Sequence, residues 1–554
     1  MKKSLSLHLG KYQKQVDERL GQWEAQSFSR RIWAKDPSLW HPEPQPEITD
    51  RLGWLVLPER MEEKCDKILS FANQIKEEGF SHVLLLGMGG SSLAPELFQK
   101  IFGNAPGFPE LFVLDSTHPK AVLAVENKVD LAHTLFLISS KSGTTLETLS
   151  LFRYFWARAT AIFDRPGRCF VAITDAGSPL ERLAREKNFR KTFLPPSDVG
   201  GRYSVFTEFG LVPAALIGLD ILKLLDNGRI ASRDSRSPGA EEKSFGFILG
   251  ATLGELARHR DKLTIWATPS LSGFPAWLEQ LLAESTGKQE KGIVPIVEEL
   301  FAPVEIYGPD RIFVGLFLEE EHSFELERRL IELEASGHPT IRIVLKDKLD
   351  LGLEFFRWEL ATACAGAVLG IHPFNQPDVQ LAKDLTRSAM EKDKDATDTA
   401  KGPFEGVSIR EERACATAIK GFLSNASPGD YVAVQAYLPP TPEITLALQN
   451  VRNALFRHTR LATTLGFGPR FLHSTGQLHK GGPNTLLAIQ VVDEPEQDLP
   501  IPETNYTFAA LIEAQAMGDY SALRQKKRRV LRISLGQSVL DGLQKLEDFF
   551  LSGE

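Results

Sequence analysis

The sequence predicts an α/β fold with parallel sheets, because short apolar runs alternate with helical periods along most of the chain. Runs typical of buried strands lie at 81–87, 111–115, 134–139, 169–175, 262–269, 311–319 and 340–347. Further runs, at 430–440, 486–492 and 528–536, predict a third α/β segment. Polar stretches at 226–244 and 391–403 predict the breaks between these blocks.

Residues 1–53 lack this alternation and predict a helical arm. Apolar residues recur at helical spacing from Tyr12 to Phe28, and the proline-rich stretch at 40–46 is typical of an extended linker or a wrapping arm. We find no residues with evident chemistry in the arm.

The composition argues against several classes of protein. Hydrophobic residues make up 42% of the 554 residues and charged residues 25%, which is ordinary for a folded globular chain. The net charge of -8 gives no basic footprint for a nucleic-acid partner. The cysteines are too scattered for a metal pair or a disulfide framework, so we expect reduced, mostly buried thiols at Cys65, Cys169, Cys364 and Cys415.

The sequence predicts neither a signal peptide nor a membrane span. Polar residues occur near the N-terminus where a signal peptide needs an apolar core of about 7–15 residues. The most apolar helical run, 360–371, is shorter than the roughly 20 residues of a membrane span. We therefore expect a cytoplasmic protein with no membrane partner.

A glycine-rich turn, GMGGSS, follows the first strand at 87–92. Such a turn before a helix offers backbone N–H groups to an anion. It is not a P-loop, because no GKS or GKT follows, and Ser92 stands where a dinucleotide fingerprint needs its last glycine. A dinucleotide site with Asp115 as the ribose acid and a plain tight turn both stay open.

A second loop, SSKSGTTLET at 139–148, follows the third strand. It crowds hydroxyl groups where a helix should begin, at Ser140, Ser142, Thr144 and Thr145. Hydroxyls and free N–H groups at a helix N-terminus suit a phosphate, whereas one Ser or Thr would suffice as an N-cap. We therefore favour phosphate binding over the N-cap alternative.

Segments at five separated places resemble, in family order, the phosphoglucose isomerases, which are built of two sugar-isomerase (SIS) domains. They are GMGGSS, SKSGTTLET, VGGRYSVFTEFGL at 199–211, QLLAESTGKQEKGIVP at 280–295 and HPFNQPDVQLAK at 372–383. The flanks RIWAKDPSLW at 31–40 and FLHSTGQLHKGGPNT at 471–485 look like the isomerase half of bacterial transaldolase–phosphoglucose isomerase fusions. The transaldolase barrel is absent from this sequence.

The resemblance implies two SIS-like doubly wound parallel-sheet domains in tandem, at 54–225 and 240–390, plus a C-terminal α/β segment at 404–554. It also implies a set of site residues by position. They are Gly90 and Ser91 for the substrate, Ser140, the Lys141 backbone, Ser142 and Thr145 for the phosphate, and Arg202, Gln280, Glu284, Gln376 and Lys383 around the reacting carbons.

The implied chemistry is aldose–ketose isomerisation, which moves a proton between C2 and C1 through a cis-enediol(ate). Glu284 would carry the proton, Arg202 would stabilise the developing charge, and Lys383 would contact the ring oxygen. Without the family, Glu284 and Lys288 would be an ordinary ion pair four residues apart, Arg202 a loop arginine paired with an acid, and Lys383 a solvated side chain.

One family residue is missing from its place. The family uses a histidine a little over twenty residues beyond the base, usually donated across a dimer interface, but no histidine lies between Glu284 and His322. The loop at 471–485 is the alternative source of the acid/base, and we predict that it acts through His479; the competing interpretation is a structural turn.

The predicted function is interconversion of D-glucose 6-phosphate and D-fructose 6-phosphate, with no metal and no cofactor. A dual phosphoglucose/phosphomannose isomerase and a non-catalytic SIS-domain sugar-phosphate sensor stay open as alternatives. A small-molecule sugar phosphate is the expected partner and a homodimer the default assembly, unless the C-terminal segment completes the site within one chain. A transaldolase acting in trans also stays open.

Overall fold

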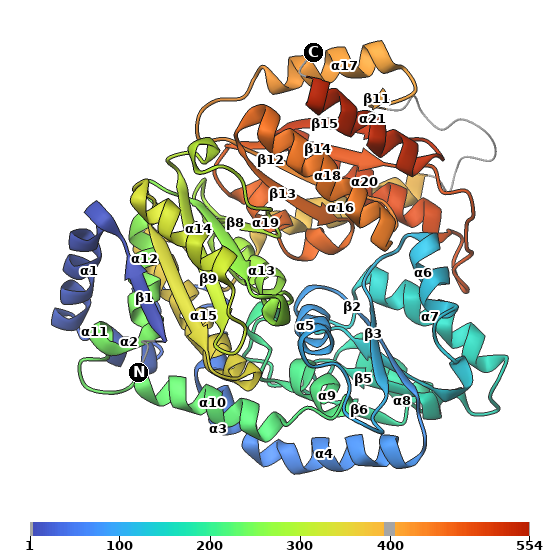
Figure 1. The fold of residues 1–554 in the computed structure, drawn as a ribbon. Coiled ribbons are helices and arrows are strands. Elements are labelled where there is room, and N and C mark those ends of the chain that lie inside the picture. The colour runs from blue at the N-terminus through green and yellow to red at the C-terminus, as the bar shows by residue number, and fades with distance from the viewer. Residues whose placement is uncertain (1–3, 393–404, 553–554) are drawn as a thin grey trace.

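The computed structural model describes residues 4–392 and 405–552, and it contains three five-stranded sheets (Figure 1). The first has the order β3-β2-β4-β5-β6, the second β8-β7-β9-β10-β1 and the third β13-β12-β14-β15-β11. In each sheet β2, β7 or β12 lies between the next strand in the chain on one side and the two strands after that on the other, and β6, β1 or β11 forms the far edge. We call each sheet with its helices the first, second and third unit.

The strands of the first unit are β2 (His82–Gly87), β3 (Glu110–Leu114), β4 (Thr134–Ser139), β5 (Phe170–Ile173) and β6 (Lys191–Phe193). Those of the second are β7 (Lys262–Ala267), β8 (Val294–Val297), β9 (Arg311–Leu318), β10 (Thr340–Leu345) and β1 (Leu5–His8). Those of the third are β11 (Val407–Ser408), β12 (Tyr431–Tyr437), β13 (Ala462–Phe467), β14 (Leu486–Val492) and β15 (Arg529–Ser534). All neighbours pair in parallel except β1, which is antiparallel to β10.

Helices cover these sheets. Before and within the first unit they are α1 (Gln13–Ala25), α2 (Phe28–Trp33), α3 (Leu57–Arg60), α4 (Glu62–Glu77), α5 (Leu93–Phe102), α6 (Pro119–Glu126), α7 (Leu146–Thr160), α8 (Pro179–Glu186) and α9 (Glu208–Leu216). Next come α10 (Ile221–Asp234), α11 (Ala240–Lys243), α12 (Phe245–Leu256), α13 (Phe274–Thr286), α14 (Phe324–Ala335), α15 (Leu351–Leu369) and α16 (Gln380–Lys392). The third unit has α17 (Glu412–Leu423), α18 (Pro442–Thr459), α19 (Gly476–Gly481), α20 (Phe508–Gln525) and α21 (Val539–Ser552).

The core of the second unit depends on a close helix crossing between α12 and α15. Glycines recur every four residues on α12, so they form one stripe. A Cβ on Gly250 would lie 2.5 Å from the Cβ of Cys364, and one on Gly254 would lie 2.6 Å from the Cβ of Val368. The stripe therefore lets the backbones of the two helices approach closely.

Every strand predicted from the sequence is present, and α1 confirms the predicted amphipathic helix. The strands that the sequence did not predict are β1, β6, β8, β11 and β13, most of which are short. The strand β1 corrects the prediction for the N-terminal arm, because it adds an edge to the sheet of the second unit. The predicted polar break at 226–244 is also wrong in part, since residues up to Asp234 continue α10.

The predicted linker at 391–403 lies almost wholly outside the described residues. The four cysteines are buried and unpaired, as predicted. Among the residues that the structure describes, no helix is long and apolar enough to cross a membrane.

The appended segment is the main refinement of the predicted fold. The sequence predicts two doubly wound units plus an α/β segment, and that segment repeats the strand order of the first two units. In Figure 1 the first unit lies at the lower right, the second at the left and the third at the top, and α5, α13 and α19 lie where they meet. In sheets of this order, ligands bind at the carboxyl ends of the strands that flank the first crossover.

Candidate active site

The glycine-rich turn after β2 is a packing centre at which three segments of the chain meet. Gly89 has φ +56°, and a Cβ there would lie 2.8 Å from the carbonyl oxygen of His473 and 2.9 Å from Nε2 of Gln280. A Cβ on Gly90 would lie 2.1 Å from the carbonyl oxygen of Gly201. Only glycine fits at these two positions, so the turn can approach the backbone of His473 in the third unit and the side chain of Gln280 in the second.

The hydroxyl-rich loop after β4 leaves its helix end open. Ser140 Oγ is 2.9 Å from Thr145 Oγ1, and Ser142 Oγ is 3.0 Å from Thr144 Oγ1. Thr145 is the N-cap of α7, but its hydroxyl makes no capping hydrogen bond. The first N–H groups of α7 and the paired hydroxyls therefore form a site suited to a phosphate. The Lys141 side chain turns away to Asp175, at 2.6 Å.

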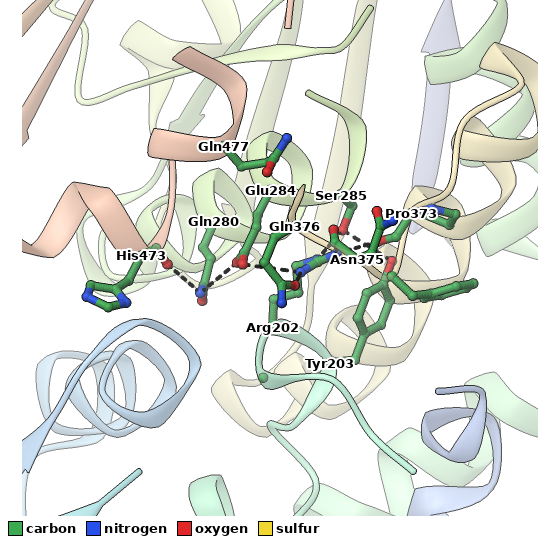
Figure 2. Close-up of polar contacts among 12 residues, drawn as sticks. Arg202, Tyr203, Gln280, Glu284, Ser285, Pro373, Asn375, Gln376, His473 and Gln477 are labelled. Atoms are coloured by element: carbon green, nitrogen blue, oxygen red, sulfur yellow. Dashed lines mark hydrogen bonds and ion pairs between the residues drawn. The ribbon is translucent and has the colours of Figure 1, made fainter. Parts of the chain in front are cut away.

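Arg202 is the hub of the polar contacts in Figure 2. It is buried on the loop after β6, where Nε donates to Ser285 Oγ at 2.8 Å. Nη1 donates to Gln376 Oε1 at 3.0 Å, and Nη2 donates to the carbonyl oxygens of Pro373 and Asn375. The guanidinium thus joins a loop of the first unit to α13 and to the segment before α16.

Glu284 pairs with this guanidinium. Its Oε1 lies 3.3 Å from Nη1 of Arg202, and its Oε2 accepts a hydrogen bond from Gln280 Nε2 at 3.1 Å. Gln280 and Glu284 share one face of α13, as the spacing predicted, and Glu284 keeps 13% of its side chain exposed. Gln280 Nε2 also donates to the carbonyl oxygen of His473, at 2.8 Å (Figure 2).

The structure does not show the ordinary ion pair between Glu284 and Lys288. Lys288 is buried, and its Nζ donates to the carbonyl oxygens of Ser285 and His372. Burial, with the nearby charge of Arg202, holds the pKa of Lys288 well below its usual range. The Glu284 carboxylate therefore pairs with Arg202 instead of Lys288.

The third unit holds the segment after Gln376 through Gln477 on α19. Gln477 Oε1 accepts from the backbone N–H of Asp378, and Nε2 donates to Asp378 Oδ2 at 2.8 Å. Lys526 pairs with the other oxygen of Asp378. These contacts fix the loop that presents Gln376 to Arg202.

His473 is the histidine that the structure brings to this site. Its Nε2 donates to Glu147 Oε1 at 3.0 Å, and Gln515 Nε2 donates to the same oxygen at 2.8 Å. Thr117 Oγ1 in turn donates to Gln515 Oε1 at 2.7 Å. Burial alone would raise the pKa of Glu147, but the charge and hydrogen bond of His473 keep it below its usual range.

His479, the predicted acid/base, lies in a different environment. It is 3% exposed on α19, and Gln435 Nε2 of β12 donates to its Nδ1 at 3.0 Å. Burial, with the charges of Lys480 and Arg528, lowers the pKa of His479 to about 3. A neutral, hydrogen-bonded imidazole facing the third sheet fits a structural role better than an acid/base.

The remaining predicted residues lie around this centre. Ser91 is buried in the glycine-rich turn, and its carbonyl oxygen accepts from Ser139 Oγ at 3.2 Å. Lys383 is exposed on α16, and its charge contributes to the lowered pKa of Glu147. Asp115, the alternative ribose acid, is paired with Arg470 at 3.3 Å.

Three other histidines beyond Glu284 have ordinary surroundings. Nε2 of His372 lies 3.0 Å from the carbonyl oxygen of Pro46, and burial lowers the pKa of His372 to about 4. His338 is buried beside Arg260, and burial likewise lowers its pKa to about 4. His322 is exposed before α14.

Sequence reasoning missed Glu147, Gln515 and the contacts that Gln477 and Lys526 make with Asp378. A signal for Glu147 existed, because an acid in the first turn of a phosphate-binding helix would repel the phosphate unless a cation neutralised it. Gln515 and Asp378 carry no such signal, since their partners lie far away in the sequence.

Known proteins resemble the chain. The phosphoglucose isomerase family model matches residues 55–304. A glucose-6-phosphate isomerase of Mycoplasmopsis pulmonis (strain UAB CTIP) is 30% identical over 394 residues, which cover 62% of this chain and 90% of that protein.

Two solved structures also align with it. A hypothetical protein of Thermus thermophilus aligns with TM-score 0.61 and 26% identity over 70% of this chain and 99% of its own. A glucose-6-phosphate isomerase of Chlamydia trachomatis shares the fold, with TM-score 0.56 and 18% identity over 69% and 87%. Each relative is matched over most of its own length, whereas part of this chain lies beyond each match.

Proposed function

Because the chain belongs to the phosphoglucose isomerase family, we propose that it interconverts D-glucose 6-phosphate and D-fructose 6-phosphate. The observation that carries the proposal is the pairing of Glu284 with Arg202 at 3.3 Å. Proton transfer next to a carbonyl needs a carboxylate to move the proton and a fixed positive charge to stabilise the oxyanion. This pair places both beside one another.

The phosphate of the substrate would bind at the loop after β4. Ser140, Ser142 and Thr145 offer hydroxyls, and the N-terminal N–H groups of α7 and the backbone of Lys141 offer donors. Gly90 and Ser91 border this loop through the contact of Ser91 with Ser139. With the phosphate bound at this loop, the other end of the sugar would reach α13.

Ring opening breaks the C1–O5 bond, removes the proton of the C1 hydroxyl and adds a proton to O5. We assign this exchange to His473, in place of the predicted His479. Glu147 accepts from Nε2 of His473 and so orients the imidazole. Lys383, whose charge helps to lower the pKa of Glu147, would contact the ring oxygen.

In the open sugar, Glu284 takes the proton from C2, and the electrons form a cis-enediolate with negative charge at O1. Arg202 stabilises that charge, a proton passes from O2 to O1, and Glu284 returns its proton to C1 to leave a carbonyl at C2. Gln280 and Gln376 fix the carboxylate and the guanidinium at the start of this cycle. The reverse sequence converts the ketose to the aldose.

All these groups come from one chain. His473 contacts Gln280 and Glu147 without a partner subunit, because the third unit lies against the other two. In this proposal a single chain supplies the whole set, so the histidine need not come from a partner subunit. Turnover per chain should accordingly stay constant as the protein is diluted.

The test is a coupled assay of glucose 6-phosphate formation from fructose 6-phosphate. Glu284→Gln should lower kcat by roughly 10²- to 10⁴-fold. The control is Glu279→Gln on the same helix: burial and the charge of Glu298 raise the pKa of Glu279 to about 8, so an uncharged isostere should leave turnover within about twofold.

Two other outcomes would redirect the proposal. Binding of the sugar phosphate without turnover would favour the sugar-phosphate sensor. Comparable turnover of mannose 6-phosphate would make the enzyme a dual-specificity isomerase.

A further inference from the structure

Arg470 ties the loop that carries His473 to the first unit. It begins the single turn η12 (Arg470–His473), which follows β13 of the third unit. Its Nη2 pairs with Glu96 Oε2, and its Nη1 lies 3.3 Å from Asp115 Oδ2. Glu96 is in the first turn of α5 and Asp115 follows β3, so both acids belong to the first unit.

These ion pairs are shielded from water. The side chains of Arg470, Glu96 and Asp115 are 25%, 21% and 11% exposed. Charges that are mostly withdrawn from water attract more strongly than exposed pairs. Burial alone would raise the pKa of Glu96, but Arg470 and Lys100 lower it to about 2. Arg470 thus lies between two neighbouring acids, of which Glu96 also pairs with Lys100.

The position of the His473 imidazole follows from the backbone of η12. In a 3₁₀ turn, side chains three residues apart lie on the same side, so Arg470 and His473 project together toward the first unit. At the other end of the turn, the His473 carbonyl oxygen accepts a hydrogen bond from Gln280 Nε2. The Cβ of His473 would lie 3.0 Å from a Cβ placed on Gly89. The turn therefore has one anchor at each end.

We propose that Arg470 is a positioning residue for ring opening: its ion pairs with Glu96 and Asp115 hold η12 on the first unit so that His473 meets Glu147. The proposal rests on the proposed function, because it concerns the step assigned to His473. Arg470 itself contacts no reacting atom in this scheme.

The experiment isolates ring opening in a Glu284→Gln background, in which the proton shuttle between C1 and C2 is removed. Ring opening and closing still interconvert the α and β anomers of glucose 6-phosphate, and exchange NMR measures that rate after subtraction of the spontaneous rate. Arg470→Met should slow enzyme-catalysed anomer exchange by roughly 10- to 100-fold, since small displacements of a reacting group have effects of that size. Arg470→Lys, which keeps one ion pair, should restore part of the rate.

The matched control is Arg529→Met. Arg529 is also on the third unit, is 27% exposed and makes a two-point ion pair, but its partner Asp430 belongs to its own unit. This control should lower the melting temperature and leave anomer exchange within about twofold of its parent. In the parent enzyme with Glu284, Arg470→Met should leave KM within about twofold, because the phosphate loop is unchanged.

Anomer exchange within twofold of the parent in Arg470→Met would overturn the inference while leaving the proposed function intact. An equal loss in Arg529→Met would also overturn it, since the effect would then be general destabilisation. Absence of isomerisation in the unaltered protein would overturn the proposed function and this inference with it. Should Arg470→Met fail to fold, Glu96→Gln removes one acid partner and is judged by the same rates.

Discussion

The first and third units share one strand order but contribute different chemistry to the site. The first unit supplies a cradle of backbone N–H groups and small hydroxyls, from the loops after β2 and β4. The third unit supplies two longer side chains, His473 and Gln477, from the connection between β13 and β14. The comparison teaches that the topology fixes where loops gather, whereas the side chains of each loop decide what chemistry a unit can offer.

The interior of the third unit explains why only one of its loop histidines is available. Gln435 and Gln490 are paired in register on β12 and β14 and are buried, although strands of a parallel sheet are usually apolar. Gln435 Nε2 donates to His479 Nδ1, and Gln490 Nε2 donates to the carbonyl oxygen of Ala516. These amides fix α19 and α20 to the sheet, so His479 anchors the loop that presents His473.

The largest expected effect separates these two histidines. His473→Gln should lower kcat with glucose 6-phosphate by roughly 10²- to 10⁴-fold and leave KM little changed, because it removes an acid/base and no phosphate donor. His479→Gln should keep kcat within about threefold and lower the melting temperature, because it disturbs a buried hydrogen bond.

The measurement is steady-state kinetics beside thermal unfolding for both variants. A large loss of kcat in His479→Gln with an unchanged melting temperature would return the acid/base to His479 and refute the assignment to His473.

A smaller effect should come from the cradle of the first unit. The double variant Ser140→Ala and Thr145→Ala removes a mutually bonded pair of hydroxyls at 2.9 Å. Because the two hydroxyls also bond to each other, we expect their removal to cost about as much as one hydrogen bond to a charged group, about 1.5–3 kcal/mol. KM should therefore rise by roughly 10- to 100-fold. Inorganic phosphate should weaken as a competitive inhibitor in proportion.

Thr160→Ala is the control for that variant. This threonine ends the same helix, and its hydroxyl bonds only locally to the carbonyl oxygen of Ala157. If KM responds equally to both changes, the hydroxyls after β4 do not hold the phosphate.

The first and third units also differ in how much of their part of the site the sequence alone could predict. The hydroxyl-rich loop after β4 is a local pattern that the sequence alone reveals. Gln280 and Glu284 come from the family resemblance, because their spacing of four on a helix only predicts that they share a face. The choice between His473 and His479 depends on contacts with Glu147 and Gln435, which are far away in the sequence. Two histidines in one loop cannot be ranked until the sheet beneath them is known.

Strand prediction failed for a related reason. The strand β13 has half-exposed residues at its end and lacks the continuous apolar run of its neighbours, and β1 is a short edge strand whose burial alternates. Pairing across the chain, with β12 and with β10, makes both into strands. Long, fully buried strands such as β4 need no such context.

The smallest expected effect concerns the contact that joins the two compared units, Glu147 with His473. The folded protein holds the pKa of Glu147 below its usual range, so this carboxylate stabilises the fold at pH values above its unfolded pKa of about 4.3. That stabilisation is lost as the pH falls through the lower, folded pKa, because the native carboxylate then binds a proton. The melting-temperature difference between the unaltered protein and Glu147→Gln should therefore shrink between about pH 5 and pH 3.

Glu78→Gln is the control, since Glu78 pairs with Arg190 within the first unit and is 38% exposed. Exposed pairs contribute little, so its melting-temperature difference should be small at every pH. A difference for Glu147→Gln that stays constant down to pH 3 would mean that its ionised form does not bind His473 in the fold. The apolar packing of Leu499 and Phe508 against the first unit and the ion pairs of Arg470 would then hold the third unit in place. Replacing Arg470 should in that case displace His473 more than replacing Glu147.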